Sequence, residues 1–214
     1  VDEFVAERYD EVLFYEFIQF ILKKQYEKLR AYAKEKGVKI LGDLPLYVAG
    51  DGEEVWRDPS VFLLNENLNP EKVAGVPPDY FSADGQLWGN PVYNYAAMKR
   101  NGYRWWKSRL RFALSRYDYL RIDHFRGLDR YWAIPNGEKA VNGKWEKAEG
   151  FEILCEFPKN RLIAEDLGVI DDGVISLISR LGLRGMKVLL FAFNGDKNNP
   201  YLPENVDEKS VSYI

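Results

Sequence analysis

Apolar residues recur at helical spacing across residues 11–36, on one stripe that consists of Leu22, Tyr26, Leu29 and Ala33. Gly37 follows directly, as is typical of the C-terminus of a helix. The next four residues, 38–41, read VKIL and have the pattern of a short buried strand. The N-terminal part of the chain is therefore predicted to be a helix followed by a strand.

The same alternation of helices and short strands continues to the end of the chain. Helices are expected around Trp106–Tyr117, at 149–157, and from Asp171 or Asp172 to Leu181, where Gly182 ends the last one. Short apolar runs predict strands at 119–122, 161–164, 186–191 and 211–214. This order favours an α/β fold with a parallel sheet and crossover helices.

Residues 53–94 have a different pattern, because they are rich in Pro, Gly, Asn and aromatic residues and show little periodicity. They are predicted to be a long loop region, of the kind that is usually functional when it is ordered. No sequence repeat or low-complexity tract interrupts the chain.

The composition of the chain argues against several classes of partner and cofactor. The net charge of −3 gives no basic field for nucleic acid, and the longest apolar run is far too short to cross a membrane. Cys155 is the only cysteine, which excludes an internal disulfide and favours a reducing, cytoplasmic compartment. One histidine and one cysteine argue against a metal cluster, and no phosphate-binding glycine motif is present, so no metal or cofactor is expected.

Three predicted strands lead into acidic residues, at Asp43, Asp123 and Glu165. The C-terminal ends of parallel strands gather at one edge, where active sites of such folds lie. Arg121 shares a strand face with Asp123 and favours its ionised form, as a nucleophile requires. Glu165 can then be the second carboxylate, with a raised pKa. Two such acids, together with the 15% aromatic residues that can stack on sugar rings, fit glycosidic-bond chemistry.

Structural interpretations remain open for each of these residues. Acids at strand ends also cap helices or pair with basic residues, and His124, the only histidine, can be a hydrogen-bonded structural residue. Trp132 fits a core position as well as a site position.

Several stretches resemble the 4-α-glucanotransferases, also called amylomaltases or disproportionating enzymes, a branch of the α-amylase superfamily. They are RIDHFRGLDRYWAIP (121–135), GDLPLYVAGDGEEVW (42–56), DYFSADGQLWGNPVYNY (79–95), LIAEDLG (162–168) and GMKVLLFAFNGDKNNPYLPENV (185–206). The resemblance implies a (β/α)8 TIM barrel with long loop insertions. It also implies transfer of an α-1,4-glucan segment to the 4-OH of glucose or another glucan, with retained anomeric configuration.

The resemblance assigns roles to individual residues. Asp123 matches the nucleophile, Glu165 matches the general acid/base, and Arg121 matches the arginine that keeps the nucleophile ionised. His124 matches a residue of the donor site, and Asp43 lies in the earlier strand-end motif.

The segment Asp79–Trp88 matches a loop over the sugar-binding cleft, with Phe81, Gln86 and Trp88 as expected contacts besides Asp79. For Phe81 and Trp88, plain loop packing is the alternative. The implied partners are α-1,4-glucans, maltooligosaccharides and glucose, without nucleic acid or a membrane. The oligomeric state and the preferred glucan length are not predicted.

The chain also departs from the family pattern. The third catalytic carboxylate of the family follows the strand that reads SVSYI here, beyond Ile214, and the early barrel strands are absent. The segment at 145–150 reads WEKAEG, where the family more often has Gly-Pro-Gly after the Trp-Lys pair. Residues 1–214 are therefore expected to be a cut part of one catalytic barrel domain, with a loop-rich insertion at about 43–100, and to be inactive in isolation. An α-glucan hydrolase of the same superfamily and a non-catalytic glucan-binding fragment are the alternatives.

Overall fold

The computed structural model describes residues 2–79, 82–168, 170–208 and 210–213, which fall into two compact units divided after Ile40. The first unit contains the short helix α1 (Asp2–Glu7) and the long helix α2 (Tyr9–Glu35). The helix predicted over 11–36 is confirmed, and Gly37 follows it with the left-handed φ of 71°. Leu22 and Leu29 of the predicted stripe are exposed in this unit.

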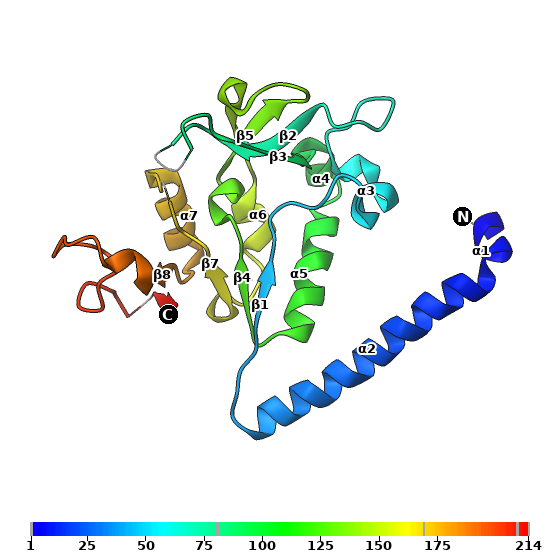
Figure 1. Cartoon of the computed structure of the whole chain (residues 1–214), viewed down its shortest axis with the longest axis horizontal. Coiled ribbons are helices and arrows are strands. Elements are labelled where there is room, and N and C mark those ends of the chain that lie inside the picture. Colours follow the sequence, from blue (N-terminus) through cyan, green and yellow to red (C-terminus); the bar gives the residue numbers. More distant parts are fainter. Residues whose placement is uncertain (1, 80–81, 169, 209, 214) are drawn as a thin grey trace. The chain divides into compact units, whose positions relative to one another are not determined.

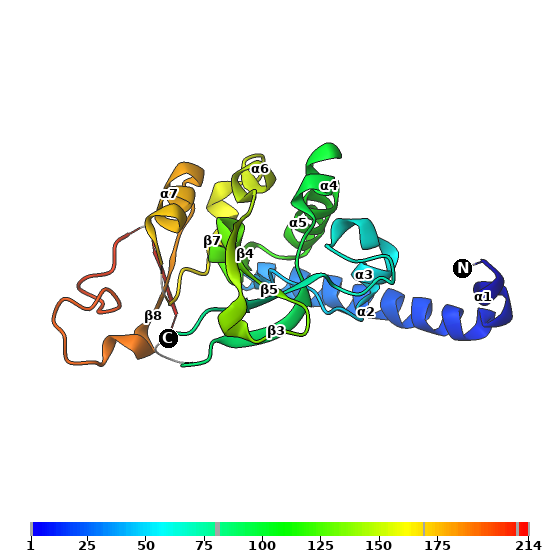
Figure 2. The same cartoon turned by 90° about the horizontal axis from the view of Figure 1, so that it is seen from above.

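The second unit is built on a parallel sheet with the strand order β1 (Leu41–Leu44), β4 (Tyr119–Ile122) and β7 (Leu162–Ala164). Strand β4 has the predicted bounds, whereas β1 begins at the last residue of the predicted strand. The helices α5 (Arg104–Arg116), α6 (Gly150–Leu154) and α7 (Asp172–Leu181) cover one face of this sheet (Figures 1 and 2). The mixed α/β fold with parallel strands and crossover helices is thus confirmed.

Alternation along β4 gives the sheet two different faces. Leu120 and Ile122 are completely buried against the helices, together with Leu110 of α5 and Val174 of α7. Each such side chain contributes about 1.5–3 kcal/mol through burial, which fixes β4 in the middle of the sheet. Arg121 lies between the two buried residues and therefore points to the opposite face, as predicted.

A second, antiparallel sheet corrects the expectation of a long loop at 53–94. Its strands are β3 (Gln86–Pro91), β2 (Lys72–Val76), β5 (Arg130–Pro135) and β6 (Lys144–Lys147), in this spatial order. The short helices α3 (Glu53–Arg57) and α4 (Tyr95–Arg100) flank β2 and β3 along the chain. Figure 1 shows this sheet beyond the C-terminal ends of the parallel strands. Pairing of β2 with β5, which is distant in sequence, stabilises strands whose own composition is typical of loops.

Two further strands follow α7. Strand β8 (Met186–Val188) pairs in parallel with β9 (Val211–Tyr213), and an isolated parallel bridge joins Ile163 to Arg184. The strand predicted at 186–191 is shorter, because a 3-10 helix, η5, begins at Leu189. The remaining 3-10 helices are η1 (Pro59–Val61), η2 (Phe125–Leu128), η3 (Ala140–Asn142) and η4 (Lys159–Arg161). The described residues form no closed barrel.

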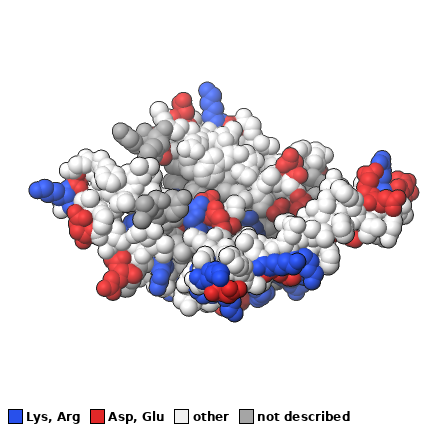
Figure 3. All heavy atoms as spheres, turned by 60° about the horizontal axis from the view of Figure 1, so that its bottom comes forward, with Lys and Arg blue, Asp and Glu red and all other residues white. Residues whose placement is uncertain are grey.

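Acidic and basic side chains are intermixed on the face drawn in Figure 3, in keeping with the net charge of −3. None of the helices described is long and apolar enough to cross a membrane. Within the same residues, no three His, Cys, Asp or Glu side chains gather in a way that could hold a metal ion.

Candidate active site

The three predicted acids come together at one edge of the parallel sheet. Asp43 lies in β1, and Asp123 and Glu165 are the first residues after β4 and β7. The backbone N–H of Asp123 donates to the carbonyl of Leu44 (3.0 Å), and that of Glu165 donates to the carbonyl of Ile122 (3.1 Å). The hydrogen-bond ladder of the sheet therefore extends to the acids themselves and fixes their backbone positions.

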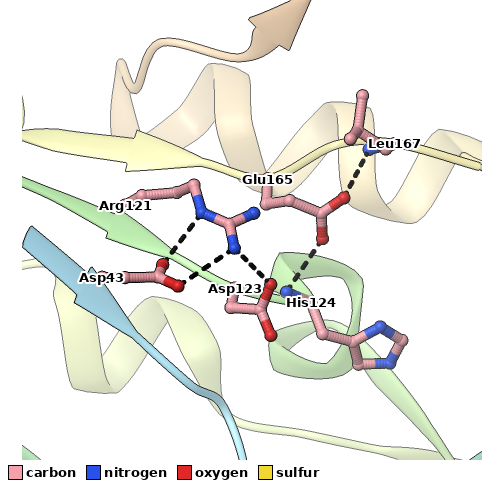
Figure 4. Close-up of polar contacts among 6 residues, drawn as sticks. All are labelled: Asp43, Arg121, Asp123, His124, Glu165 and Leu167. Atoms are coloured by element: carbon pink, nitrogen blue, oxygen red, sulfur yellow. Dashed lines mark hydrogen bonds and ion pairs between the residues drawn. The ribbon is translucent and has the colours of Figure 1, made fainter. Parts of the chain in front are cut away.

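Arg121 joins two of these acids (Figure 4). Its Nε and Nη2 donate to the two carboxylate oxygens of Asp43, at 2.9 and 3.1 Å, and Nη2 also donates to Asp123 at 2.7 Å. The carboxylates are 54% and 42% exposed, respectively, while the Arg121 side chain is 23% exposed. The guanidinium is therefore held by two carboxylates, and the second oxygen of Asp123 makes no bond to Arg121.

Glu165 has a different environment. Its Oε2 accepts a hydrogen bond from the backbone N–H of His124 (2.8 Å), and its Oε1 accepts one from that of Leu167 (3.2 Å; Figure 4). Burial, followed by the charge of Asp123, raises the pKa of Glu165, although the two N–H groups and Arg121 oppose the shift. The site thus contains one carboxylate that is paired with a guanidinium and one that retains its proton to higher pH than an ordinary glutamate.

His124 stands at the turn between these two acids. Its backbone is left-handed, with φ 49° and ψ 48°, and it is the N-cap residue of the 3-10 helix η2. Burial, with a smaller contribution from the charge of Arg126, lowers the pKa of His124 to about 4, so the imidazole is neutral at pH 7. Among the described residues no hydrogen-bond partner reaches its buried Nε2. A neutral imidazole nitrogen is suited to a hydroxyl group, which can donate or accept.

Aromatic rings lie on the other side of His124. The ring of Trp88, on β3, meets the imidazole edge-to-face with centroids 4.7 Å apart, and its indole N–H donates to Gln86 (3.0 Å). The ring of Tyr47 lies 6.1 Å from Trp88 and 6.2 Å from His124. Tyr47 was missed by the sequence reasoning, although it lies in the same motif as Asp43 and only four residues after it.

The remaining predicted positions have separate outcomes. Asp79 takes part in a local turn in the loop between β2 and β3, where its carboxylate accepts from the N–H of Ser82 (2.8 Å). Phe81 lies outside the described residues. Trp132 has a core role, because its indole N–H donates to the carbonyl of Ala140 (2.8 Å) and its ring packs on Trp145.

The model of the 4-alpha-glucanotransferase family, which is also described as glycoside hydrolase family 77, matches residues 1–214. The chain belongs to this family. It is 50% identical over 205 residues to a 4-alpha-glucanotransferase of Aquifex aeolicus, which covers 94% of this chain and 42% of that protein. The 4-alpha-glucanotransferase of Thermus thermophilus is 47% identical over 201 residues, or 92% of this chain and 40% of that protein.

Solved structures agree with this family membership. The amylomaltase from Streptococcus agalactiae, determined in complex with acarbose, has a TM-score of 0.85 and 39% identity over 91% of this chain and 41% of its own. An amylomaltase from Corynebacterium glutamicum, at 24% identity and a TM-score of 0.80, supports the fold alone. The chain thus spans about two fifths of the length of these relatives, 42% for the protein from Aquifex aeolicus and 40% for the protein from Thermus thermophilus.

Proposed function

We propose that the chain forms part of the catalytic domain of a 4-α-glucanotransferase. The observation that carries this proposal is the pair Asp123 and Glu165, which share one sheet edge but have opposite electrostatic environments. Retaining enzymes that act on glycosidic bonds need such a pair, one as nucleophile and one as acid/base. The names of the relatives support the same reaction.

In the first half-reaction, the free oxygen of Asp123 attacks the anomeric carbon of an α-1,4-glucan. The glycosidic bond breaks, Glu165 gives its proton to the leaving oxygen, and a glycosyl ester forms on Asp123. The raised pKa of Glu165 keeps the proton available for this step. Arg121 keeps the nucleophile ionised until the attack.

In the second half-reaction, Glu165 takes the proton from the 4-OH of an acceptor, whose oxygen displaces Asp123 from the anomeric carbon. Two inversions give overall retention of configuration. Transfer, as opposed to hydrolysis, needs an acceptor sugar in place of water. The rings of Trp88 and Tyr47 and the neutral His124 supply flat apolar surface and a polar atom for sugar rings beside the acids.

We extend the proposal to the architecture. Residues 1–214 are proposed to belong to one catalytic (β/α)8-barrel domain, with the region at about 43–100 as its loop-rich insertion. The parallel order of β1, β4 and β7 and the helices on one face support this view. Because Asp43 and Asp123 are about half exposed, residues 1–214 alone are proposed not to exclude water or turn over a glucan.

The proposed substrates are α-1,4-glucans and maltooligosaccharides as donors, with glucose or a further glucan as acceptor. Asp79, Phe81, Gln86 and Trp88 are proposed to contact sugar, with His124 at the donor side. The position of the Trp88 ring on the imidazole of His124 supports a common binding surface for these groups. A cytoplasmic location is proposed on the basis of the single, exposed Cys155 and is tested by cell fractionation.

The experiment is incubation with maltotriose of a chain that has the full length of the relatives. We expect a ladder of shorter and longer glucans that includes glucose, while the number of reducing ends stays constant. A steady rise in reducing ends without longer products would identify an α-glucan hydrolase. Binding of glucan without any product would leave only the non-catalytic alternative.

A further inference from the structure

The 3-10 turn η2, which follows Asp123, is tied to the start of helix α7, which follows Glu165 along the chain. Nη2 of Arg126 in η2 donates to Oδ2 of Asp171, the N-cap residue of α7, at 2.6 Å. The two residues are separated by 45 positions, so the ion pair joins the two segments that leave the catalytic strand ends. The charge of Arg126 contributes to the lowered pKa of His124, but none of the catalytic or binding roles proposed above is assigned to either residue.

Both partners are held from further directions. Oδ1 of Asp171 accepts the N–H groups of Gly173 (3.1 Å) and Val174 (3.2 Å), so both carboxylate oxygens are engaged. The guanidinium of Arg126 lies over the ring of Trp145 on β6, 4.1 Å from its centroid. Burial raises the pKa of Asp171, but the N–H of Val174 and the charge of Arg126 outweigh burial and lower it below its ordinary value.

This pair differs from an ordinary surface ion pair. The Arg126 side chain is only 13% exposed, although that of Asp171 is 46% exposed, and its guanidinium both donates to a carboxylate and lies over an indole, so it has little freedom. Exposed ion pairs are worth little, because both side chains must be ordered to form them. Here both side chains are already ordered by other contacts, Asp171 by its hydrogen bonds at the N-terminus of α7 and Arg126 by the ring of Trp145 on β6.

The turn that Arg126 belongs to also positions the acid/base. His124 is the N-cap residue directly before η2, and its backbone N–H donates to Glu165. His124 has a left-handed backbone, which a residue with a side chain adopts only when its surroundings impose it. Any shift of η2 therefore moves His124, which donates its N–H to Glu165 and directly follows Asp123 in the chain.

We propose that the Arg126–Asp171 ion pair is a positioning device that fixes the η2 turn against the N-terminus of α7 and so holds the donor N–H of His124 on Glu165. The expected effect on kcat rests on the proposed function, whereas the positioning of the His124 N–H by the ion pair does not. Arg126 and Asp171 are positioning residues and make no contact with substrate in it.

Asp171→Asn is the sharpest variant, because asparagine caps a helix as well as aspartate does and only the charge partner of Arg126 is removed. We expect kcat to fall about 10- to 100-fold with little change in KM, as for a small displacement of catalytic groups. Loss of the N–H donor favours the protonated form of Glu165, so the alkaline limb of the pH profile should move to higher pH. The loss of the negative charge of Asp171 would by itself lower the pKa of Glu165 and move that limb to lower pH. The direction of the shift therefore distinguishes a displaced N–H donor from a purely electrostatic effect.

Arg126→Lys tests the other partner, since it keeps the charge but loses the planar fork that stacks on Trp145. We expect the same direction of change in kcat and in the alkaline limb. The matched control is Glu156→Gln, at a contact between α5 and the chain after α6. It breaks the ion pair of Glu156 with Arg111, which is also 2.6 Å long and joins residues 45 positions apart, together with the ion pair of Glu156 with Lys107 (3.0 Å). That variant should leave kcat and the pH profile unchanged.

A readout without catalysis keeps the two proposals distinguishable. The NMR signal of the His124 amide proton can be assigned by its change in the His124→Gln variant. Its chemical shift should follow the titration of Glu165 in the wild type, and this pH response should be smaller in Asp171→Asn. Unchanged His124 titration and an unchanged alkaline limb in both variants would overturn the positioning role. So would loss of the folded state in both, since the pair would then be a stability element only. A wild type that makes no glucan ladder but retains the His124 response would contradict the proposed function alone.

Discussion

The two sheets of this molecule contribute to the site in different ways. The parallel sheet supplies the carboxylates from strand ends whose backbone is hydrogen-bonded and whose neighbours, Leu120 and Ile122, are completely buried. The antiparallel sheet supplies Trp88 from β3, a strand whose first four residues are exposed. In the proposed function, the bond-making chemistry, which depends on distances of a few tenths of an ångström, is assigned to the rigid sheet, and sugar contact is assigned to the open one.

The two sheets should therefore differ in kinetics. Changes at the parallel sheet remove groups that act in the transition state and should lower kcat. Changes at the antiparallel sheet remove binding surface and should mainly raise KM. Each variant below is intended for a chain of the relatives' full length.

The largest effect is expected for Asp123→Asn, because an amide cannot form the glycosyl ester. Turnover of maltotriose should fall at least about 10⁴-fold, as for the loss of a nucleophile in other covalent mechanisms. Glucan binding should persist, because the rings beside His124 are unchanged. Quantified product separation and a binding isotherm measure both. Undiminished turnover would reduce Asp123 and Arg121 to a structural ion pair.

The next largest effect is expected for Glu165→Gln. Each lost proton transfer costs about 10²–10⁴-fold in kcat. A donor with a leaving group that needs no proton, such as a glycosyl fluoride, should recover the first half-reaction but not the second. A first burst of fluoride release that is slowed as much as cleavage of maltotriose would argue against an acid role for Glu165.

The pH dependence of the wild type follows from the same residue. Protonated Glu165 is present below its pKa and is lost as the pH rises through it. Since burial and Asp123 raise this pKa, the alkaline limb of kcat/KM should lie above the range of an ordinary glutamate. The limb should vanish in Glu165→Gln, and its persistence would assign it to another group.

The smallest effect is expected for Trp88→Ala, which removes a 38% exposed ring from the antiparallel sheet. We expect KM for maltotriose to rise about tenfold with kcat within a factor of a few, as the loss of about 1.4 kcal/mol of uniform binding predicts. The matched control is Trp56→Ala on α3, since that ring is 73% exposed and makes no aromatic contact with the residues of the site in the described chain. A fall in kcat as large as that of Glu165→Gln would break the distinction between the two sheets.

The sequence predicted the parallel sheet better than the antiparallel one. Strand β4 was placed correctly because alternating Leu120 and Ile122 mark a buried face, and α7 was placed correctly because Asp171 and Gly182 mark its ends. Strands β2 and β3 were missed because KVAGV and QLWGNP contain glycine or proline, which disfavour strands in isolation. Strand β2 also pairs with β5, which is distant in sequence, and a local pattern does not contain that information.

The same division holds for the site. Asp43, Asp123 and Glu165 were found because strand ends of a parallel sheet meet at one edge, and Arg121 because of its spacing from Asp123. Tyr47 and the tie between Arg126 and Asp171 were missed, because they depend on loops whose courses only tertiary packing decides. The proximity of Trp88 to His124 likewise depends on the antiparallel sheet.

The central claim is that Asp123 forms the covalent bond while Glu165 moves the proton. Incubation of Glu165→Gln with an α-maltosyl fluoride, followed by proteolysis and mass spectrometry, tests it most directly. Fluoride leaves without protonation and the missing base slows the second step, so the glycosyl ester should accumulate. The account predicts a maltosyl group on the peptide that contains Asp123, and none in the Asp123→Asn/Glu165→Gln double variant. A label on Asp43, which shares Arg121 with Asp123, or on any other residue would contradict it.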